Sequence, residues 1–405
     1  MKSTILFAII GIACLTGTSC DQKGKPVINR DGRILKVPTE FSTIEMAVKN
    51  SENGDWIILA PGKYFEMKID IEKSVTISSE WKISGDELKI EENIIDSQDS
   101  ILFNIKADGV EISGLKIING DHPLNITARA TIKNNHFVGN LDAMSFEGSG
   151  GGYVGYNTVE NDRDDGLDLD IRSGEQNKGS DIIVEYNTIM NSHDDGIEIR
   201  LYNYPDQNIN YIVRGNRISG SQNAGIQIIS YDIFTGKVFQ IHHNIISGCK
   251  TGLGCMEGSN TREDMTGASK MDELVLFYNN TLVDNQMGAT GGNNIIAVNN
   301  LVQGNSLGGF KRFSANSVVI NNLFYQNGGE DLIAFNESVT KEGNIFSVDP
   351  LLDKTSFIPA VNSPCIDAGK TKYELNSESI LEVPSEYISG TAPDIGAIEL
   401  NAQTR

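Results

Sequence analysis

Two acidic segments of nearly identical sequence contain the strongest candidates for catalytic or metal-binding residues in this chain. The first reads NDRDDGLDLDIR (residues 161–172) and the second NSHDDGIEIR (residues 191–200). Each contains an Asp-Asp-Gly triplet, and the triplets begin thirty residues apart, at Asp164 and Asp194. Carboxylates gathered in one place repel one another, so their pKa should rise unless a cation lies among them. The segments therefore predict one of three things: a bound hard cation such as Ca2+, acid–base catalysis, or a solvated acidic surface neutralised by arginine.

A recurring asparagine indicates how the two segments could meet. It stands in a repeated pattern in which an apolar residue and Asn are followed by an apolar pair and then Asn or Gly. Its steps are 22, 30, 29, 28, 36, 20 and 22 residues, so the basic period is about twenty-two with insertions. This period, with short strand-like runs, predicts a solenoid, and the framework of a leucine-rich repeat is absent. The asparagines are Asn135, Asn157, Asn187, Asn216, Asn244, Asn280, Asn300 and Asn322.

Apolar and charged residues alternate in the segment LDLDIR (167–172), as they do in a β-strand with one buried face. Three short strands per period predict an all-β fold, a right-handed parallel β-helix. Each recurring Asn is expected at a turn, with a left-handed backbone, stacked on the Asn of the next coil. The segment FSTIEMAVKN (41–50) predicts a short N-terminal helix that begins with a capping box from Ser42 to Glu45.

Aligning the coils by their inward residues turns the two acidic segments into one site. Neighbouring coils of a β-helix are about 4.8 Å apart, so residues thirty positions apart can become neighbours. The inward column is then Met144, Leu167, Ile197 and Ile226, and the two outward columns are Ser145, Asp168, Glu198 and Gln227, and Glu147, Asp170, Arg200 and Ile229. The candidate metal ligands that converge are Asp164, Asp165, Asp168, Asp194, Asp195 and Glu198.

Composition limits the possible partners. The formal net charge is −21, which argues against nucleic acid because no basic surface offsets the phosphates. An anionic substrate would need a local Arg/Lys patch or a bound cation.

Cys249, Cys255 and Cys365 are too few for a disulfide scaffold, although a Cys249–Cys255 bond or two buried thiols both fit the sequence. We expect a monomer.

The N-terminus has the features of an export signal. Residues 1–19 combine a basic start with a short apolar run, and Gly17-Thr18-Ser19-Cys20 resembles a bacterial lipobox. That resemblance implies lipidation of Cys20, a polar tether over residues 20–34, and a folded domain over residues 35–400. We expect an exported protein whose only membrane contact is a lipid anchor, in the bacterial outer membrane or at the cell surface, with the periplasmic face as the other option.

The two ends of the predicted domain resemble a known group of proteins. The opening FSTIEMAV and GDWIILAPGKY, with the ending NSPCIDAG (362–369) and APDIGAIE (392–399), is similar to secreted bacterial right-handed parallel β-helix proteins of the pectate-lyase-like type. The resemblance covers most of residues 35–400 and is specific for fold. It is weak for activity, because that superfamily holds lyases, hydrolases, epimerases and proteins without a known reaction.

The motif DDGLD, which contains Asp164, Asp165 and Asp168, resembles the calcium-binding motif of family-nine pectate lyases. The resemblance implies Ca2+ at these residues and β-elimination in a uronic-acid polysaccharide. That family uses a lysine base on a later coil, whereas the outward position here is Arg200, so we consider Arg200, Lys178 and Asp195 as catalytic candidates, with Lys237 as a further base. Arg172 is expected to steer the substrate carboxylate, and Tyr202, Tyr204 and Tyr231, in the insertions that should wall a groove, to stack on sugar rings.

Two alternatives stay open. Polygalacturonase-like glycoside hydrolases also use paired Asp on a β-helix, but their Arg-x-Lys clamp is absent, and His193 or His242-His243 would have to serve instead. The third possibility is a surface glycan-binding or structural protein whose acids only hold Ca2+.

Overall fold

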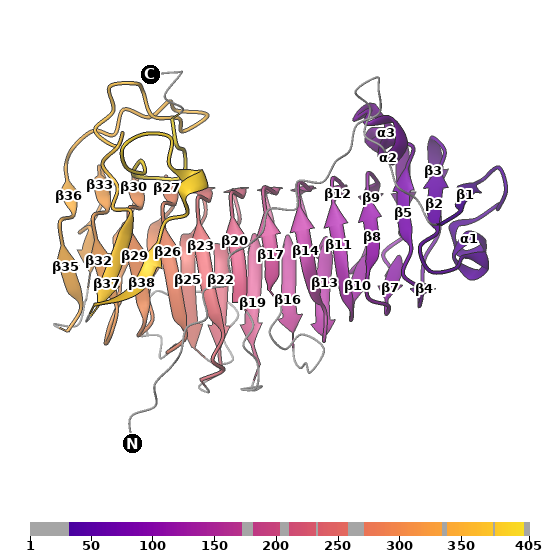
Figure 1. Ribbon diagram of the computed structural model, residues 1–405, viewed down its shortest axis with the longest axis horizontal. Coiled ribbons are helices and arrows are strands. Elements are labelled where there is room, and N and C mark those ends of the chain that lie inside the picture. The colour runs from indigo at the N-terminus through magenta and orange to yellow at the C-terminus, as the bar shows by residue number, and fades with distance from the viewer. Residues whose placement is uncertain are drawn as a thin grey trace.

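Three long parallel sheets, joined coil by coil, make up the protein (Figure 1). The structure is a computed structural model, and it describes residues 32–171, 181–202, 210–231, 234–257, 271–333, 338–375 and 377–400. The chain visits the sheets in a fixed order, for example from β15 to β16 to β17, and each strand pairs in parallel with its counterparts in the neighbouring coils. The predicted parallel β-helix is therefore confirmed.

The strands have the following bounds. The thirteen-stranded sheet contains β1 (Ile34–Val37), β2 (Trp56–Leu59), β5 (Thr76–Ser79), β8 (Val110–Ser113), β11 (Arg129–Lys133), β14 (Gly151–Gly155), β17 (Ile182–Glu185), β20 (Asn210–Arg214), β23 (Val238–His242), β26 (Leu274–Tyr278), β29 (Ile295–Val298), β32 (Val318–Ile320) and β35 (Thr340–Glu342). The eleven-stranded sheet contains β4 (Ile69–Ile71), β7 (Phe103–Ile105), β10 (Leu124–Ile126), β13 (Met144–Gly148), β16 (Leu167–Ile171), β19 (Ile197–Leu201), β22 (Ala224–Ser230), β25 (Thr251–Glu257), β28 (Met287–Thr290), β31 (Gly308–Lys311) and β34 (Leu332–Ile333). The twelve-stranded sheet contains β3 (Gly62–Tyr64), β6 (Asn93–Asp96), β9 (Lys116–Ile118), β12 (His136–Val138), β15 (Thr158–Glu160), β18 (Thr188–Met190), β21 (Arg217–Ser219), β24 (Ile245–Ser247), β27 (Thr281–Val283), β30 (Leu301–Gln303), β33 (Leu323–Tyr325) and β36 (Ile345–Phe346).

The recurring asparagines form a ladder inside the solenoid. Asn157 donates from Nδ2 to Oδ1 of Asn187 at 3.0 Å and to the carbonyl of Ile132 at 2.9 Å. The same pattern links Asn187 to Asn216, so stacking is confirmed. The expected left-handed backbone is wrong by one position: it belongs to the preceding residue, such as Tyr156 (φ 58°). That residue turns the chain, which leaves the Asn side chain free to point inward and bond both neighbouring coils.

A short helix covers the first end of the solenoid. Helix α1 (Ile44–Asn50) buries Ile44, Ala47 and Val48 against the core. The predicted capping box is displaced by one residue, because the N-cap is Thr43, whose side chain accepts the main-chain N–H of Met46 at 3.1 Å. The carboxylate of Glu66 accepts two further N–H groups of the first turn. The other helices are α2 (Trp81–Ser84) and α3 (Leu88–Glu91), and a 3-10 turn spans Ser385–Tyr387.

The C-terminal segment lies across the outside of the last coils (Figure 1). Its antiparallel hairpin, β37 (Lys372–Leu375) and β38 (Glu378–Glu382), brings Leu381 and Val383 against residues of β26, β29 and β32. Cys249, Cys255 and Cys365 are buried and form no disulfide, so the alternative of two buried thiols at Cys249 and Cys255 is confirmed. No helix in the described part of the chain is long and apolar enough to cross a membrane.

Candidate functional site

The two acidic segments lie on adjacent coils, in the predicted register. Strand β16 pairs with β13 and β19 so that Ser145, Asp168 and Glu198 are neighbours, and β19 pairs with β22 so that Gln227 follows Glu198. Glu147 faces Asp170 in the next outward column. The thirty-residue interval is therefore one coil of the helix, and the acids of both segments belong to one place.

The Asp-Asp-Gly turns stack through their own carboxylates. Oδ1 of Asp165 accepts the N–H of Asp195 at 2.8 Å, and Oδ1 of Asp142 in the preceding coil accepts the N–H of Asp165 at 2.9 Å. Oδ1 of Asp195 in turn accepts the N–H of Ala224 at 2.6 Å and the side-chain amide of Asn223 at 2.9 Å. We call Asp142, Asp165 and Asp195 the carboxylate ladder. Like the asparagine ladder it joins side-chain oxygens to main-chain N–H groups of neighbouring coils, but in the opposite direction, because here the oxygen of the earlier coil accepts the N–H of the later one.

Glycine is needed after each Asp pair because the turns stack so closely. A Cβ on Gly166 would lie 2.5 Å from the carbonyl oxygen of Gly196, and a Cβ on Gly196 would lie 2.6 Å from that of Gly225. Both distances are shorter than any real contact of this kind. The third residue of the triplet thus allows the two turns, and the carboxylates before them, to approach to strand spacing.

Burial contradicts the interpretation of a solvated acidic surface. Asp168 is 8% exposed and Glu198 1%, and Asp165 and Asp195 are also buried, whereas Asp164 is partly exposed. All five residues of β16 are buried, so alternation along this strand marks which face a side chain points to and not whether water reaches it. Buried carboxylates require a proton, a counter-charge or a cation.

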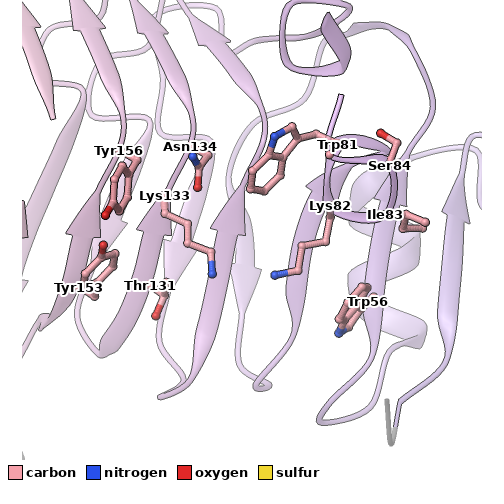
Figure 2. Close-up of a pocket in the computed structure, with 11 residues that line it drawn as sticks. Trp56, Trp81, Lys82, Ile83, Ser84, Thr131, Lys133, Asn134, Tyr153 and Tyr156 are labelled. Atoms are coloured by element: carbon pink, nitrogen blue, oxygen red, sulfur yellow. The ribbon is translucent and has the colours of Figure 1, made fainter. Parts of the chain in front are cut away.

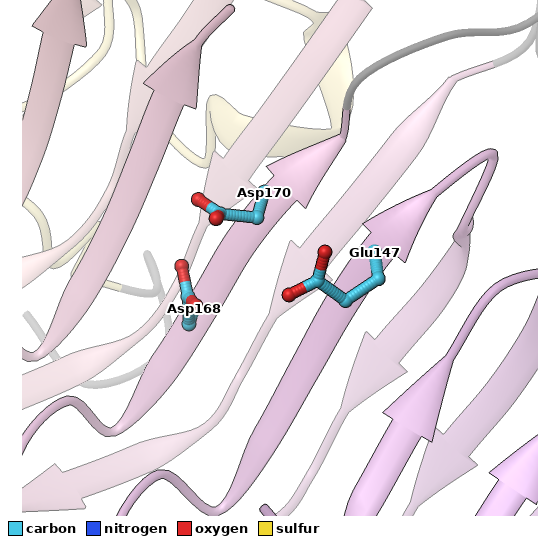
Figure 3. A group of neighbouring side chains, drawn as sticks. All are labelled: Glu147, Asp168 and Asp170. Atoms are coloured by element: carbon cyan, nitrogen blue, oxygen red, sulfur yellow. The ribbon is translucent and has the colours of Figure 1, made fainter.

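The buried acids converge in three overlapping groups. In each group, one oxygen from every residue lies within 4.8 Å of the others. Figure 3 shows one group, in which the side chain of Glu147 on β13 extends toward Asp168 and Asp170 on the neighbouring strand β16. The groups are Asp165 with Asp168 and Glu198, Asp164 with Asp165 and Asp194, and Glu147 with Asp168 and Asp170. We call these residues the acidic cluster.

The protein environment opposes ionisation of these carboxyls. Burial, then the charges of Asp195 and Glu198, raise the pKa of Asp165 well above its usual value. Burial and neighbouring carboxylates likewise raise the pKa of Asp168 to about 9, and Asp195 shifts in the same direction. For Glu198, burial outweighs the nearby Arg200 and raises the pKa to about 7. Without a cation, Asp168 therefore holds a proton at neutral pH, and the environment of the other three carboxyls favours their protonated form.

The chemistry of the donor set fits Ca2+. Calcium takes oxygen ligands at about 2.3–2.6 Å, so two ligands on opposite sides of the ion are about 5 Å apart. Oxygens of Asp165, Asp168 and Glu198 within 4.8 Å of one another match that spacing. In the described structure, Oδ1 of Asp168 and Oδ2 of Asp195 are buried without a hydrogen-bond donor, as expected of atoms that receive an ion.

Arg200 is the counter-charge of the cluster. Its Nε lies 2.6 Å from Oε1 of Glu198 and 3.7 Å from Oδ1 of Asp170. Burial lowers the pKa of Arg200, but the charges of Glu198 and then Asp170 outweigh it and raise the pKa above its ordinary value. A guanidinium held this firmly in its charged form favours electrostatic work over the predicted role as a base.

Asp195 lies beneath the surface of the site. Its exposed fraction is 0%, and it is bonded within the carboxylate ladder. This burial favours a structural or ligand role over the predicted role in catalysis. Lys237 is also buried, at 2% exposure. The pair His242 and His243 belongs to the end of β23 in the thirteen-stranded sheet, where it packs on Tyr278 and Tyr387 and not on the acidic cluster.

Two of the predicted aromatic residues stand beside the acids. The rings of Tyr202 and Tyr231 stack with centroids 5.2 Å apart, and the hydroxyl of Tyr202 donates to Oδ2 of Asp170 at 2.9 Å. Both rings are partly exposed. Arg172, Lys178, Tyr204 and Cys20, which the sequence also proposed, lie outside the described residues.

Sequence reasoning missed three members of the site. Glu147 and Asp170 were aligned with the acids but not proposed as ligands, and Asp142 was not considered. Asp142 stands 23 residues before Asp165, the same offset that separates the paired Met144 and Leu167. That offset was the available signal. Nε2 of His122 lies 2.9 Å from Oδ2 of Asp142 and extends the network by one more coil.

Comparisons with known proteins agree with this geometry at the level of fold. Residues 81–232 match the family model of the right-handed β-helix region. The chain is a right-handed parallel β-helix. The catalytic unit of a thermostable GH87 α-1,3-glucanase from Streptomyces thermodiastaticus strain HF3-3 aligns with TM-score 0.53 and 14% identity, over 75% of this chain and 65% of that one.

Two more solved structures are similar to this β-helix. XylC in complex with xylose has TM-score 0.52 and 9% identity, over 80% of this chain and 88% of that one. Pectate lyase Pel9A has TM-score 0.47 and 16% identity, over 93% of this chain and 98% of that one. The search of curated proteins found no match. At these identities the likeness shows the fold alone.

Proposed function

We propose that this β-helix protein is a carbohydrate-active enzyme that cleaves a uronic-acid-containing polysaccharide by Ca2+-assisted β-elimination at the acidic cluster. The observation that carries the proposal is the convergence of Asp165, Asp168 and Glu198, with oxygens within 4.8 Å of one another and little exposure to water. Solved lyases and hydrolases of polysaccharides with the same fold support the general class.

Asp165, Asp168 and Glu198 are the proposed ligands of Ca2+, with Asp164 and Asp194 beside them and Asp195 behind them. When bound, the ion neutralises a uronate carboxylate and makes the proton on the adjacent ring carbon more acidic. This role answers the problem posed by a net charge of −21, which by itself repels an acidic polymer.

The chain's own residues supply the remaining steps. Arg200, fixed by Glu198, presents a permanent positive charge that orients the substrate carboxylate, a task that Arg172 shares in this proposal. The stacked rings of Tyr202 and Tyr231 form an apolar wall for a sugar ring. In elimination, the ring carbon loses its proton, a carbon–carbon double bond forms, and the glycosidic oxygen leaves and takes up a proton. Because Arg200 stays protonated, we assign the base to Lys178.

Carboxylate spacing favours this reaction over hydrolysis. Acid and base of an inverting glycosidase stand about 6.5–9.5 Å apart, and those of a retaining enzyme about 5–5.5 Å. The oxygens of the acidic cluster are closer, within 4.8 Å, and in the group of Asp165, Asp168 and Glu198 all three residues are buried. That spacing suits a shared cation better than a sugar bond placed between two carboxyls.

The test uses the intact protein with polygalacturonate and alginate. We expect unsaturated chain ends, read by their ultraviolet absorbance, in the presence of Ca2+ and their loss with a chelator or in Asp168→Asn. New reducing ends without the absorbance would replace the lyase with a hydrolase. Neither signal, while Ca2+ still raises the melting temperature, would leave a glycan-binding or structural protein.

We also propose that Cys20 carries a lipid that anchors the exported protein in the bacterial outer membrane or at the cell surface. The lipobox-like sequence before Cys20 supports the proposal. Expression of Cys20→Ser should move the protein from the membrane fraction to the soluble fraction and prevent labelling with a radioactive fatty acid. Unchanged fractionation of the variant would contradict the anchor.

A further inference from the structure

A second hollow lies on a different sheet from the acidic cluster. It has a volume of about 1100 Å³, and its lining comes from β2, α2, β11 and β14 (Figure 2). In the thirteen-stranded sheet these strands follow the order β2, β5, β8, β11, β14. The hollow therefore crosses four strand spacings of about 4.8 Å, or roughly 19 Å, along the axis of the solenoid. We call it the aromatic groove.

The register explains the shape of the aromatic groove. One column across the sheet contains Trp56, Thr76, Glu111, Thr131 and Tyr153 in consecutive strands. Large rings thus stand at both ends of the column, and polar residues lie between them, of which Thr131 lines the groove. Trp81 stands near the middle of this row, where its ring covers Gly114, the residue after β8, so closely that a Cβ there would lie 2.7 Å from Cε3 of the indole. Figure 2 shows Trp56 toward one end, Tyr153 and Tyr156 at the other, and Trp81 between them.

Two exposed tyrosines extend this surface, and both adopt a strained, left-handed backbone conformation. Tyr156 is 52% exposed and Tyr186 41%, and their rings stack with centroids 5.2 Å apart. Both have a left-handed backbone, with φ of 58° and 54°, where most of the corresponding residues in other coils are Asn or Gly. Bulky residues are disfavoured in that conformation. Exposed rings that carry this cost without filling the core indicate a surface used for binding.

The charge of the groove is positive although the chain is acidic. The charged residues among its lining are Lys82 and Lys133. Their ammonium groups lie 2.6 Å and 3.2 Å from the same carboxylate, that of Glu111. Glu111 neutralises one of the two lysines, and Glu87 at the edge of the groove accepts the indole N–H of Trp81 at 3.2 Å. The excess positive charge is therefore confined to the part of the groove around Lys82 and Lys133.

We propose that the aromatic groove binds a chain of acidic sugars as a second, non-catalytic site. Sugar rings stack on the aromatic residues, hydroxyls bond to the polar residues between them, and a uronate carboxylate pairs with Lys82 and Lys133. The inference shares the ligand class of the proposed function but rests on a separate face, because the groove belongs to the thirteen-stranded sheet and the acidic cluster to the eleven-stranded sheet.

The position of the tryptophans gives a selective test. The whole chain has two Trp residues, Trp56 and Trp81, and both line the groove. Tryptophan fluorescence therefore reports directly on this site. Oligogalacturonates and oligoalginates are titrated in the presence of a chelator, with neutral cello-oligosaccharides for comparison. We expect a saturable change with an acidic probe, weakened by salt, and much weaker binding of the neutral one.

Substitutions sharpen the test. Tyr156→Ala and Lys133→Gln should each raise the Kd about three- to tenfold. Phe65→Ala removes an exposed ring that does not line the groove and should leave the Kd unchanged. Asp168→Asn should also leave it unchanged while abolishing release of unsaturated ends, so the groove and the proposed function fail independently. The proposal is overturned by the absence of a saturable signal with both acidic probes, by equal affinity for neutral ones, or by an unchanged Kd in both groove variants.

Discussion

Oδ1 of Asp165 accepts the main-chain N–H of Asp195 at 2.8 Å, one coil away. In the asparagine ladder a similar bond runs in the opposite direction, because Oδ1 of Asn187 accepts the N–H of Asn157 in the preceding coil. An amide at such a position is neutral and satisfies both neighbours, whereas an acid brings a charge into a buried place. The carboxylate ladder is thus a piece of ordinary solenoid architecture in which the acid is retained at a cost in stability, as expected where it serves a ligand.

Calcium should stabilise the protein through Asp168. An ion at a hundred times its Kd adds about 2.7 kcal/mol to the free energy of unfolding. We expect addition of Ca2+ to raise the melting temperature of the chelator-treated protein, and Asp168→Asn to lose most of that rise. The control is Glu378→Gln, an exposed residue of β38. An equal rise in both variants would place the ion elsewhere.

Asp162 should make stability depend on pH. Its Oδ1 accepts the N–H of Asn140 at 2.9 Å, and burial raises its pKa from 3.8 to about 8. The folded state therefore holds a proton that the unfolded state has lost, so stability falls as pH rises from about 4 to about 8. Asp162→Asn should remove this fall and gain roughly 1–3 kcal/mol above pH 8, with little gain below pH 4.

The measurement is denaturant unfolding across that pH range in the presence of a chelator. The matched reverse substitution is Asn187→Asp, which places an acid in the asparagine ladder and should lose stability at neutral and alkaline pH. A gain for Asp162→Asn that is equally large in acid would mean that charge is not its cause.

Arg200 should stabilise the fold through Glu198, which is 1% exposed. Removing one partner of a buried ion pair leaves the other uncompensated. Because Arg200 is partly exposed, we expect Arg200→Gln to lower the free energy of unfolding by about 2 kcal/mol in chelator, below the usual cost for a fully buried pair. The loss should grow above pH 7, because there Glu198 is ionised in the unaltered protein and its charge is stabilised by Arg200, which the variant lacks.

Arg200→Lys keeps the charge and should recover part of the loss, while Arg217→Gln at the surface should change stability by less than about 0.5 kcal/mol. If Arg200→Gln unfolded no more easily than Arg217→Gln at any pH, the ion pair would not be a stabilising feature.

The asparagine ladder should be a main support of the central coils. In Asn187→Ala, the carbonyl of Val154 and the amides of Asn157 and Asn216 lose buried hydrogen-bond partners. Four bonds are lost, and at about 1 kcal/mol for each bond the loss is about 4 kcal/mol. Asn104→Ala removes an exposed side-chain bond to Asp70 and a partly buried one from Asn125, and it should cost about 1 kcal/mol or less. Thermal unfolding compares the two, and similar costs would count against the ladder.

Two substitutions of Tyr202 distinguish the contribution of its ring to substrate binding from that of its hydroxyl. Tyr202→Phe loses the bond to Asp170 but keeps the stacked ring beside Tyr231, whereas Tyr202→Ala loses both. If the ring holds sugar, Tyr202→Ala should raise KM about three- to tenfold with a small change in kcat, and Tyr202→Phe should resemble the unaltered protein. Initial rates of unsaturated-end formation measure both constants. Equal effects of the two substitutions would assign the role to the hydroxyl.

The sequence predicted the fold and the register because both follow from periodic patterns. A repeat near twenty-two residues required stacked coils, and the inward column from Met144 to Ile226 fixed which acids become neighbours. The placement of the left-handed residue and of the helix cap each missed by one position. Such single-residue offsets depend on local backbone geometry, which composition does not specify.

Burial of the acids could not be read from the pattern. Alternation showed that Asp168 and Glu198 face outward from the core, but whether water reaches them depends on side chains from adjacent coils, including Arg200 over Glu198. The aromatic groove was invisible for a similar reason. Trp56 and Tyr153 are nearly a hundred residues apart, and only the stacking of the intervening coils puts them on one surface.

The stacking of coils along one axis also determines which parts of the molecule unfold most easily. In a solenoid each repeat is stabilised only by contacts with its neighbours, so partial unfolding begins at the terminal coils and proceeds inward. Strands β16 and β19 have several coils on either side. Loosening at α1 or at the C-terminal hairpin would have to pass through those coils before it reached the acidic cluster. The central position therefore protects the cluster from events at either end of the chain.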